Sequence, residues 1–200
     1  MRCFTLFTWQ WPFLAGELGG RPLEGYLLET RIVLTGPESC GKTELANQLS
    51  EQLSVPCVPE IARDYLLKRN SSYLPSDLLE IAGLQYQKEE ATRKKSDYVA
   101  DTDQQVLSIW WQEKFGPIPQ FICDLYKKQS RGLYLLCYPD LAWESDPLRE
   151  NENDRLRLFD VYLKDLIKRE LSFRIIKGSG EERLNNAINS IEDYRASTLA

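Results

Sequence analysis

The sequence predicts an α/β fold built on a parallel sheet of five strands with helices on both faces. From residue 31 onwards, short apolar segments alternate with segments of helical periodicity. This alternation is typical of parallel strands joined by crossover helices. The run at 132–138 is apolar without interruption, which indicates a strand that is buried on both faces. A glycine-rich turn joins the first strand to the first helix.

Local patterns support the individual elements. The expected strands are short apolar or β-branched runs, at 31–35, 57–58, 98–100, 132–138 and 173–176. The expected helices lie between and after them, at 42–53, 61–68, 75–95, 105–115, 119–127, 154–170 and 181–194. In two of these helices one apolar face is clear, formed by Leu45, Ala46, Leu49 and Leu53 and by Leu78, Leu79, Ala82 and Tyr86. The segment 140–153 is polar and is expected to be an irregular connection.

Composition narrows the classes of protein to consider. The chain has 200 residues, 42% of them apolar, and a formal charge of −5, which favours one domain with an ordinary core. Without a basic block, nucleic acid is not expected as a partner, and no segment reaches membrane length. The absence of histidine excludes a Ser-His-Asp triad, a histidine base and a histidine-ligated metal. The five scattered cysteines are typical of a reduced, cytoplasmic protein.

We expect two regions along the chain. Residues 1–30 form an N-terminal extension, which is either poorly ordered or the product of a non-native start. Its aromatic run resembles a secretory signal only superficially, because polar residues interrupt it and no small-residue cleavage site follows. The folded domain is expected at 31–196. The residues leave the oligomeric state open.

The turn after the first strand carries the complete signature of a phosphate-binding loop (P-loop). It reads Gly36-x-x-x-x-Gly41-Lys42-Thr43, after a strand and before a helix, which disfavours a chance glycine turn. Such a loop curls its backbone amides around phosphate, beside the positive end of the helix dipole. Lys42 is expected to reach the β- and γ-phosphates and Thr43 to ligate Mg²⁺, so ATP and Mg²⁺ are the expected cofactors. The expected nucleotide-binding residues here are Gly36, Glu38, Ser39, Cys40, Gly41, Lys42, Thr43 and Glu44.

Carboxylates follow two of the expected strands at the same edge of the sheet. Asp101 and Asp103 come where the third strand ends, and Glu60 follows the second. Because ligands bind beyond the carboxyl ends of parallel strands, these groups are candidates to hold Mg²⁺ or to accept the proton of a substrate hydroxyl. The alternatives are that the aspartates cap the next helix and that Glu60 pairs with a cation such as Arg63.

The connection at 140–153 is a candidate lid. Arg149, and Arg155 just beyond it, could offset charge on a transferring phosphoryl group, and Trp143 could stack on an aromatic ring. The alternative is a solvated loop with a surface tryptophan. Trp110 and Trp111 are adjacent, so one of them should face the core and the other is a candidate for the cleft.

Several of these stretches resemble one family, in order along the chain. They are Gly36-Pro-Glu-Ser-Cys-Gly-Lys-Thr43, Val58-Pro-Glu-Ile-Ala-Arg63-Asp-Tyr65, Asp101-Thr-Asp103, Trp143 with Asp146 and Leu148-Arg149, and Arg155. Over about residues 31–194 the chain resembles the NadR-like nicotinamide riboside kinases, which are P-loop kinases. The loop motif is common to many families, whereas the whole series is much more specific.

The resemblance implies transfer of the γ-phosphoryl group of ATP to the 5′-hydroxyl of nicotinamide riboside, a small-molecule substrate. The catalytic residues it implies are Lys42, Glu60, Asp103 and Arg149, with Glu60 preferred as base and Asp103 as its rival. The substrate-binding residues it implies are Glu60, Arg63, Gln85, Asp101, Asp103 and Trp143, with Trp143 at the nicotinamide ring. It adds Arg155 to the nucleotide-binding residues and places the metal at Thr43 and Asp101.

Two departures from the family pattern lie in the lid. The family commonly has Pro before the tryptophan and Asp-Gly before Leu-Arg, where this chain has Ala142 and Asp146-Pro147. Pro147 fixes φ and stiffens the lid, which bears on its closing motion. Two alternatives therefore stay open: a kinase of another nucleoside or small alcohol, and an ATP-binding regulatory protein with little turnover.

Overall fold

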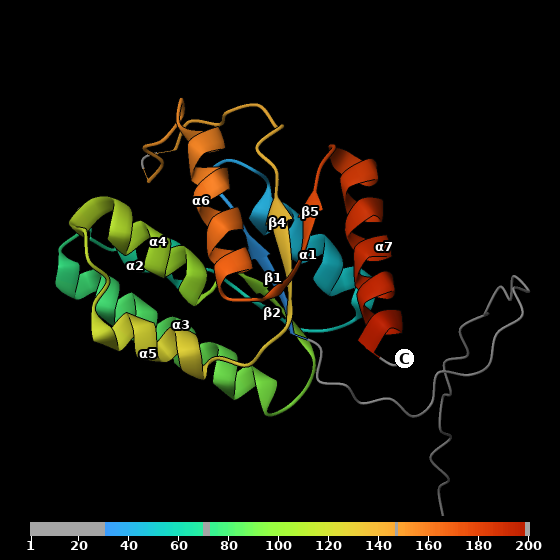
Figure 1. The fold of residues 1–200 in the computed structure, drawn as a ribbon, viewed down its shortest axis with the longest axis horizontal. Helices are drawn as coiled ribbons and strands as arrows, with labels where there is room; N and C mark the ends of the chain where they lie inside the picture. Colours follow the sequence, from blue (N-terminus) through green and yellow to red (C-terminus); the bar gives the residue numbers. More distant parts are fainter. Residues whose placement is uncertain (1–30, 70–72, 147, 199–200) are drawn as a thin grey trace, which may run out of the picture.

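Five parallel strands form the central sheet of the computed structural model, which describes residues 31–69, 73–146 and 148–198 (Figure 1). The strands are β1 (Arg31–Thr35), β2 (Cys57–Val58), β3 (Tyr98–Asp101), β4 (Leu133–Cys137) and β5 (Ser172–Ile176). Their order is β2-β3-β1-β4-β5, and all of the paired strands run parallel. The predicted α/β fold is confirmed. The predicted extension at 1–30 and Pro147 lie outside the described residues.

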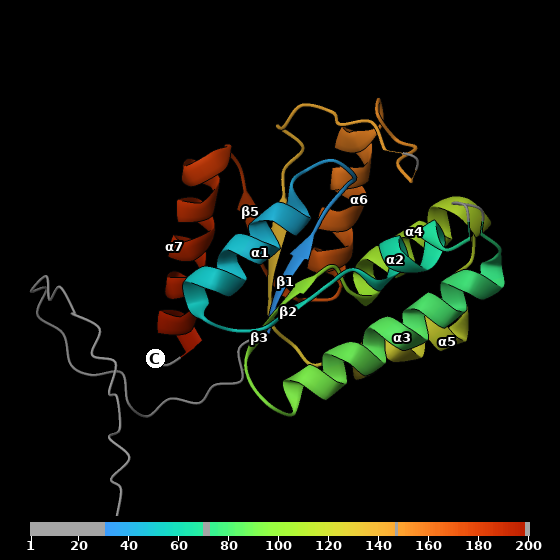
Figure 2. The same cartoon turned by 180° about the vertical axis from the view of Figure 1, so that it is seen from behind.

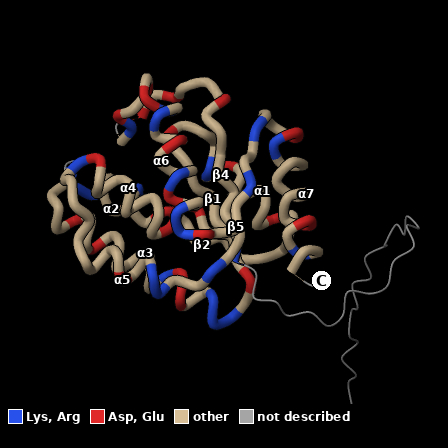
Figure 3. Tube along the Cα trace, viewed as in Figure 1, with Lys and Arg blue, Asp and Glu red and all other residues tan. Residues whose placement is uncertain are grey.

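The helices connect these strands as the sequence predicts. They are α1 (Lys42–Leu53), α2 (Ile61–Leu67), α3 (Pro75–Arg93), α4 (Gln104–Phe115), α5 (Gln120–Lys128), α6 (Arg155–Lys168) and α7 (Gly180–Thr198). Most bounds agree with the predicted ones to within two residues, and α7 continues past its predicted end at 194. None of the described helices is long and apolar enough to cross a membrane. Charged residues of both signs are spread over the helices and the lid (Figure 3).

Two helical layers cover the sheet, with α1 and α7 on one face and α6 on the other (Figures 1 and 2). Alternate residues of β1 point into the two layers. Ile32 packs in one apolar cluster with Leu49 of α1, while Val33 packs in the other with Phe159 of α6. The near-continuous apolar character of the central strands therefore reflects burial on both faces.

A third apolar cluster joins α2, α3, α4 and α5 beside the sheet. In the sheet register, Leu34 of β1 stands beside Asp101 of β3 and Leu135 of β4, so the three strands end close together. The P-loop, the carboxylates after β2 and β3, and the connection after β4 therefore meet at one edge of the sheet.

Candidate active site

The P-loop wraps tightly between β1 and α1. Gly36 and Gly41 have φ angles of 128° and 73°, a region that side-chain-bearing residues rarely adopt. A Cβ atom on Gly36 would lie 2.8 Å from the carbonyl oxygen of Cys137, so a larger residue would also clash. The Nζ of Lys42 donates hydrogen bonds to the carbonyl oxygens of Gly36 (3.0 Å) and Pro37 (2.6 Å). The lysine thus lies inside the curl of the loop, where a phosphate chain is expected.

A buried arginine holds the P-loop from the far side. Arg183, near the start of α7, is only 4% exposed. Its Nη2 donates to the carbonyl oxygens of Cys40 (2.7 Å) and Tyr138 (3.1 Å). Its Nη1 donates to Asp140 Oδ1 and to the carbonyl oxygen of Gly178, both at 2.8 Å. One guanidinium therefore ties the loop to the ends of β4 and β5, and it was not among the sequence-predicted site residues.

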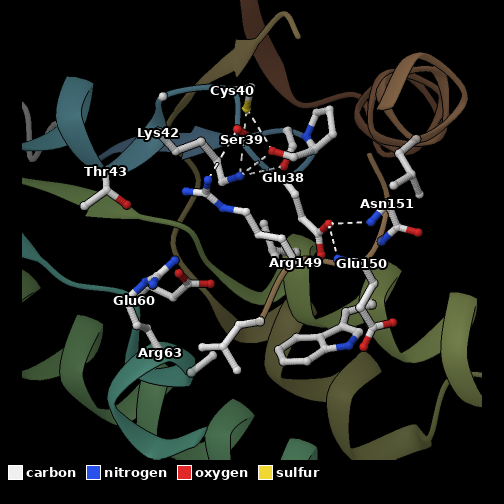
Figure 4. A pocket seen from close by; sticks show the side chains of 18 of the residues that line it. Glu38, Ser39, Cys40, Lys42, Thr43, Glu60, Arg63, Arg149, Glu150 and Asn151 are labelled. Carbon is white, nitrogen blue, oxygen red and sulfur yellow. Dashed lines mark hydrogen bonds between the residues drawn. The ribbon is translucent and has the colours of Figure 1, made fainter. Parts of the chain in front are cut away.

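A cavity of about 570 Å³ opens next to the P-loop. Figure 4 shows Lys42 and Thr43 on one side of this hollow and Glu60 and Arg63 on another. Its lining includes residues 36–44, Glu60 just before α2, and Ala62, Arg63 and Leu66 of α2. It also includes Val106, Ile109, Trp110, Glu113 and Lys114 of α4, and lid residues such as Leu148, Arg149, Glu150 and Asn151. Some of the predicted loop, acidic and lid residues therefore line one cavity, and others do not.

Glu60 and Asp101 are the strand-end carboxylates whose charges act on Lys42 of the P-loop. Glu60 lines the cavity, and burial together with the negative charge of Asp101 raises its pKa, against the lowering effect of Lys42 and Arg63. Asp101 is 3% exposed, and burial raises its pKa as well, while the hydroxyl of Thr43 and the charge of Lys42 oppose that rise. The Oδ1 of Asp101 is buried and has no hydrogen-bond partner among the described residues. Asp101 is not among the residues that line the cavity, so of these two carboxylates only Glu60 lies at its surface.

Asp103 lies in the core rather than in the cavity. It is 0% exposed and is not among the cavity-lining residues. Its Oδ2 accepts hydrogen bonds from Arg31 Nη2 (2.7 Å) and Tyr134 Oη (2.6 Å), and its Oδ1 accepts one from Gln105 N (2.8 Å). Both oxygens are therefore in use, and Asp103 is the N-cap of α4. In this structure Asp103 caps the following helix, which was the alternative to a catalytic role.

The backbone at Thr102 separates the two aspartates. Thr102 has a φ of 71°, which is unusual for a β-branched residue, and its own carbonyl oxygen accepts a long hydrogen bond from Gln85 Nε2 (3.5 Å). Gln85 is 2% exposed, and its Oε1 accepts from the backbone N of Ile61 at 3.0 Å. Gln85 thus links α3 to the start of α2 and does not line the cavity.

The connection after β4 lies against the P-loop as a lid. The Oε2 of Glu38 accepts hydrogen bonds from the backbone N of Glu150 and of Asn151, both at 2.9 Å (Figure 4). Arg149 Nη1 donates to Ser39 Oγ (3.3 Å) and to the carbonyl oxygen of Glu144 (2.6 Å). These contacts hold Arg149 at the loop.

Two ion pairs tie the same lid to the helices across the cavity. Arg63 Nη1 of α2 lies 2.8 Å from Asp146 Oδ2, and Lys114 of α4 pairs with Glu150. The lid therefore spans from the P-loop to the far wall.

Two further predicted residues lie outside the cavity lining. Arg155 Nη1 donates to the carbonyl oxygens of Ser39 (3.1 Å) and Leu141 (2.9 Å), so it supports the loop from behind. Its guanidinium carbon stands 5.7 Å from the ring centroid of Trp143. Trp143 therefore covers Arg155, and it does not line the cavity.

Comparison with known proteins places this geometry in a family. A family model described as an AAA domain (AAA_28) matches residues 31–183. The chain belongs to this AAA domain family. None of the curated protein sequences matches it. The match begins at β1 and extends to Arg183, so it takes in the P-loop, the cavity walls and the lid.

Solved structures with the same fold include kinases. A crystal structure of the NadR protein in complex with NR has a TM-score of 0.72 at 19% identity, and one with NAD and AMP-PNP has a TM-score of 0.66 at 20% identity. The AAA-domain chain is covered over 83% in each case but spans only about half (50% and 49%) of those NadR chains. Thymidylate kinase from Ehrlichia chaffeensis, at 15% identity, has a TM-score of 0.59 and matches over 84% of this chain and 97% of its own. The fold of this AAA domain is thus NadR-like.

Two residues of the AAA-domain site, Arg183 and Lys114, were not predicted from the sequence, and the choice between Trp110 and Trp111 was left open. Arg183 lies far along the chain in a charged helix, and only the fold brings it under the loop. Trp110 was left as one of two neighbours, and the structure places Trp110 at the cavity and Trp111 in the core at 8% exposure. Lys114 could have been found as the residue one helical turn beyond Trp110 on the same face of α4.

The loop and Asp101 could also hold a metal ion. Among the described residues, no group of three or more Cys, Asp or Glu side chains has the arrangement of a protein-only metal site. A hydroxyl on Thr43 next to the free oxygen of Asp101 fits Mg²⁺ better, because this ion keeps several waters and shares the phosphates of its nucleotide.

Proposed function

We propose that this protein is a kinase that transfers the γ-phosphoryl group of ATP to the 5′-hydroxyl of nicotinamide riboside. The observation that carries the proposal is that the P-loop with Lys42 and the carboxylate of Glu60 line the same cavity. A phosphoryl donor held by the loop and an alcohol held at Glu60 would be neighbours within it. The membership of the AAA domain family and the NadR-like fold support this reading.

The P-loop side of the cavity supplies the groups that hold the donor. Backbone amides of the loop and the Nζ of Lys42 would bind the phosphates once the lysine leaves the carbonyl oxygens of Gly36 and Pro37. Arg149, already at Ser39, would lie beside the transferring group and offset its charge. Thr43 and Asp101 would hold Mg²⁺, which supplies charge neutralisation at the phosphate oxygens.

Glu60 is the base that we propose for the acceptor hydroxyl. It lines the cavity, whereas Asp103 is fully buried with both oxygens bonded to protein groups. A base must be ionised and able to reach the hydroxyl, and the raised pKa of Glu60 favours proton uptake during transfer. Asp101 does not line the cavity, and we assign it to the metal because its carboxylate is hydrogen-bonded to Thr43.

The charges around the cavity favour an acceptor without a phosphate of its own. Each of the described Lys and Arg side chains in the lining is already engaged. Arg63 pairs with Asp146 and Lys114 with Glu150, while Lys42 and Arg149 lie at the P-loop. A nucleoside monophosphate would need a free cation on the acceptor side to replace its hydration. A riboside has no phosphate and therefore needs no free cation on the acceptor side.

We place this kinase domain at residues 31–196, with residues 1–30 as an extension that precedes it. Since the reaction needs ATP, we place the protein in the cytoplasm. Its acceptor is a small molecule, and the reaction calls for neither nucleic acid nor a membrane.

An acceptor panel tests the proposal directly. The full chain is incubated with ATP, Mg²⁺ and, in parallel, nicotinamide riboside, other nucleosides, small alcohols and nucleoside monophosphates. The expected result is that nicotinamide riboside has the highest kcat/KM and that the monophosphates are poor acceptors. Preference for another riboside or alcohol would show that the proposed acceptor is wrong, while the protein would still be a kinase. Tight ATP binding without transfer to any acceptor would instead support a regulatory protein.

A further inference from the structure

We propose that the indole ring of Trp110 is the surface on which the aromatic ring of the acceptor lies. This rests on the proposed function, and it names a residue that determines specificity for a planar ring. The lid residue Trp143 is not placed for this task, because it does not line the cavity and stands against the guanidinium of Arg155.

One face of α4 forms the wall that contains Trp110. The α4 residues that line the cavity are Val106, Ile109, Trp110, Glu113 and Lys114. Their spacing of three and four places them on one side of a helix. The adjacent side carries Leu107 and Trp111, which are 4% and 8% exposed and belong to the third apolar cluster. The two adjacent tryptophans therefore have different tasks, one in the core and one at the cavity.

The indole of Trp110 is held in place by Tyr73. Its Nε1 donates a hydrogen bond to the hydroxyl of Tyr73 at 2.9 Å, and the two rings meet edge to face with centroids 5.1 Å apart. The polar N–H of the indole is thus already satisfied by the protein. What Trp110 can offer to a ligand is its carbon surface, which suits a flat aromatic ring rather than a hydrogen-bonding group.

The surroundings of Trp110 are apolar as well. Leu66 of α2 and Leu148 of the lid also line the cavity and pack with the same apolar cluster as Trp110. The other ring in the lining, Tyr162, is 6% exposed and packs in the cluster under the sheet, so it presents less surface. A planar ring placed between α4 and the lid would be covered by carbon on more than one side.

A comparison of two acceptors tests the role of Trp110. Nicotinamide riboside carries the ring, and methyl β-D-ribofuranoside offers the same 5-hydroxyl on a furanose without it. In the W110A variant we expect kcat/KM for nicotinamide riboside to fall roughly ten- to a hundred-fold, the range typical of losing one aromatic stacking contact. The value for methyl β-D-ribofuranoside and the Kd for ATP should change less than about threefold. W110F, which keeps an aromatic surface, should retain most of the activity.

Two controls make the test specific. W143A removes the same side chain from the surface of the lid and should leave both acceptors unaffected. W110F guards against misfolding, because it keeps a ring where W110A leaves a void. The proposal is overturned if W110A treats the two acceptors alike, or if W143A alone weakens nicotinamide riboside.

Direct binding separates this inference from the proposed reaction. Nicotinamide riboside is titrated calorimetrically into wild type and W110A in the presence of AMP-PNP, which requires no turnover. Binding that is lost in W110A, without phosphorylation in wild type, would support the ring surface and reject the kinase reaction. If wild type phosphorylates nicotinamide riboside and both proteins bind it with equal affinity, the kinase reaction is supported and the role of Trp110 is rejected. If wild type shows neither binding nor phosphorylation of nicotinamide riboside, both fail.

Discussion

Replacing Asp103 separates a structural aspartate from a catalytic one. Asp103 is fully buried and faces the guanidinium of Arg31, which lies equally close to Glu89, with both Nη2–oxygen distances at 2.7 Å. Tyr134 donates a further hydrogen bond to Asp103 at 2.6 Å. The aspartate therefore closes a buried network between β1, β4 and α4, and it does not face the cavity.

The cost of Asp103→Asn follows from these contacts. Asparagine keeps the shape and an oxygen for the backbone N of Gln105, but it loses the negative charge that faces Arg31. Hydrogen bonds to charged groups contribute about 1.5–3 kcal/mol each, and Glu89 remains as a partner of Arg31. We expect the free energy of unfolding to fall by about 2–4 kcal/mol. Native domains have about 5–15 kcal/mol, so the variant should still fold.

Urea unfolding and steady-state kinetics on the same preparation check this prediction. Asp103→Asn should lower the unfolding midpoint while kcat stays within about threefold of wild type at a temperature where the variant is folded. Glu60→Gln is the matched control, since it should leave the midpoint nearly unchanged and lower kcat about 10²- to 10⁴-fold. A large loss of kcat in Asp103→Asn at an unchanged midpoint would refute the reasoning and restore Asp103 as the base.

The remaining predictions concern the loop, the lid and the base. The ionised form of Glu60 is the active one, and burial and the charge of Asp101 raise the pKa of this carboxyl group. The value of kcat should therefore fall on the acid side at a higher pH than it would for an ordinary glutamate. The pH profile of Glu60→Gln should lack this acid limb, and a profile identical to that of wild type would exclude Glu60 as the base. Lys42→Ala should abolish ATP binding or turnover, measured by calorimetry and kinetics, whereas normal activity would remove the P-loop from the account. Glu38→Ala should free the lid amides of Glu150 and Asn151 and lower kcat about tenfold. Glu38→Gln should have a milder effect because it keeps an acceptor oxygen. Equal effects of the two changes would show that these hydrogen bonds do not hold the lid. Arg183→Lys should lower the free energy of unfolding by about 2–4 kcal/mol because lysine cannot make all four bonds, and an unchanged thermal midpoint would show that the clamp is dispensable.

The order of the elements could be predicted from the sequence because each signal is local. The run 31–35 has the exact bounds of β1, and the predicted bounds of α1 and β2 agree as well. In these segments the apolar residues recur at the spacing of the element that they form, so the sequence pattern and the observed burial agree. The P-loop belongs to the same class, since its motif fixes a strand, a turn and a helix in one short stretch.

The tasks of individual side chains at the sheet edge could not be predicted in this way. Asp101 and Asp103 are two residues apart, and only the unusual φ of Thr102 sends one towards the P-loop and the other into the core. No periodicity rule specifies such a turn. Arg31 is another case, because a strand residue at the edge of a motif gives no sign that it will face two buried carboxylates.

Residues brought together by the fold from distant parts of the chain were missed for a related reason. Arg183 contacts the carbonyl oxygen of Cys40 over a sequence separation of 143 residues. The lid also differs from expectation, because Trp143 stands against Arg155 instead of the cavity. Composition made the segment a candidate lid, but the direction of each side chain depends on its packing against the loop.

The measurement that tests the central claim most directly is transfer of labelled phosphate. ATP carrying ³²P in the γ-position is mixed with nicotinamide riboside and Mg²⁺, and the products of wild type and Lys42→Ala are separated. The account predicts labelled nicotinamide mononucleotide from wild type and none from the variant. Label that stays in ATP, or that passes to water at the same rate with and without the riboside, would contradict it.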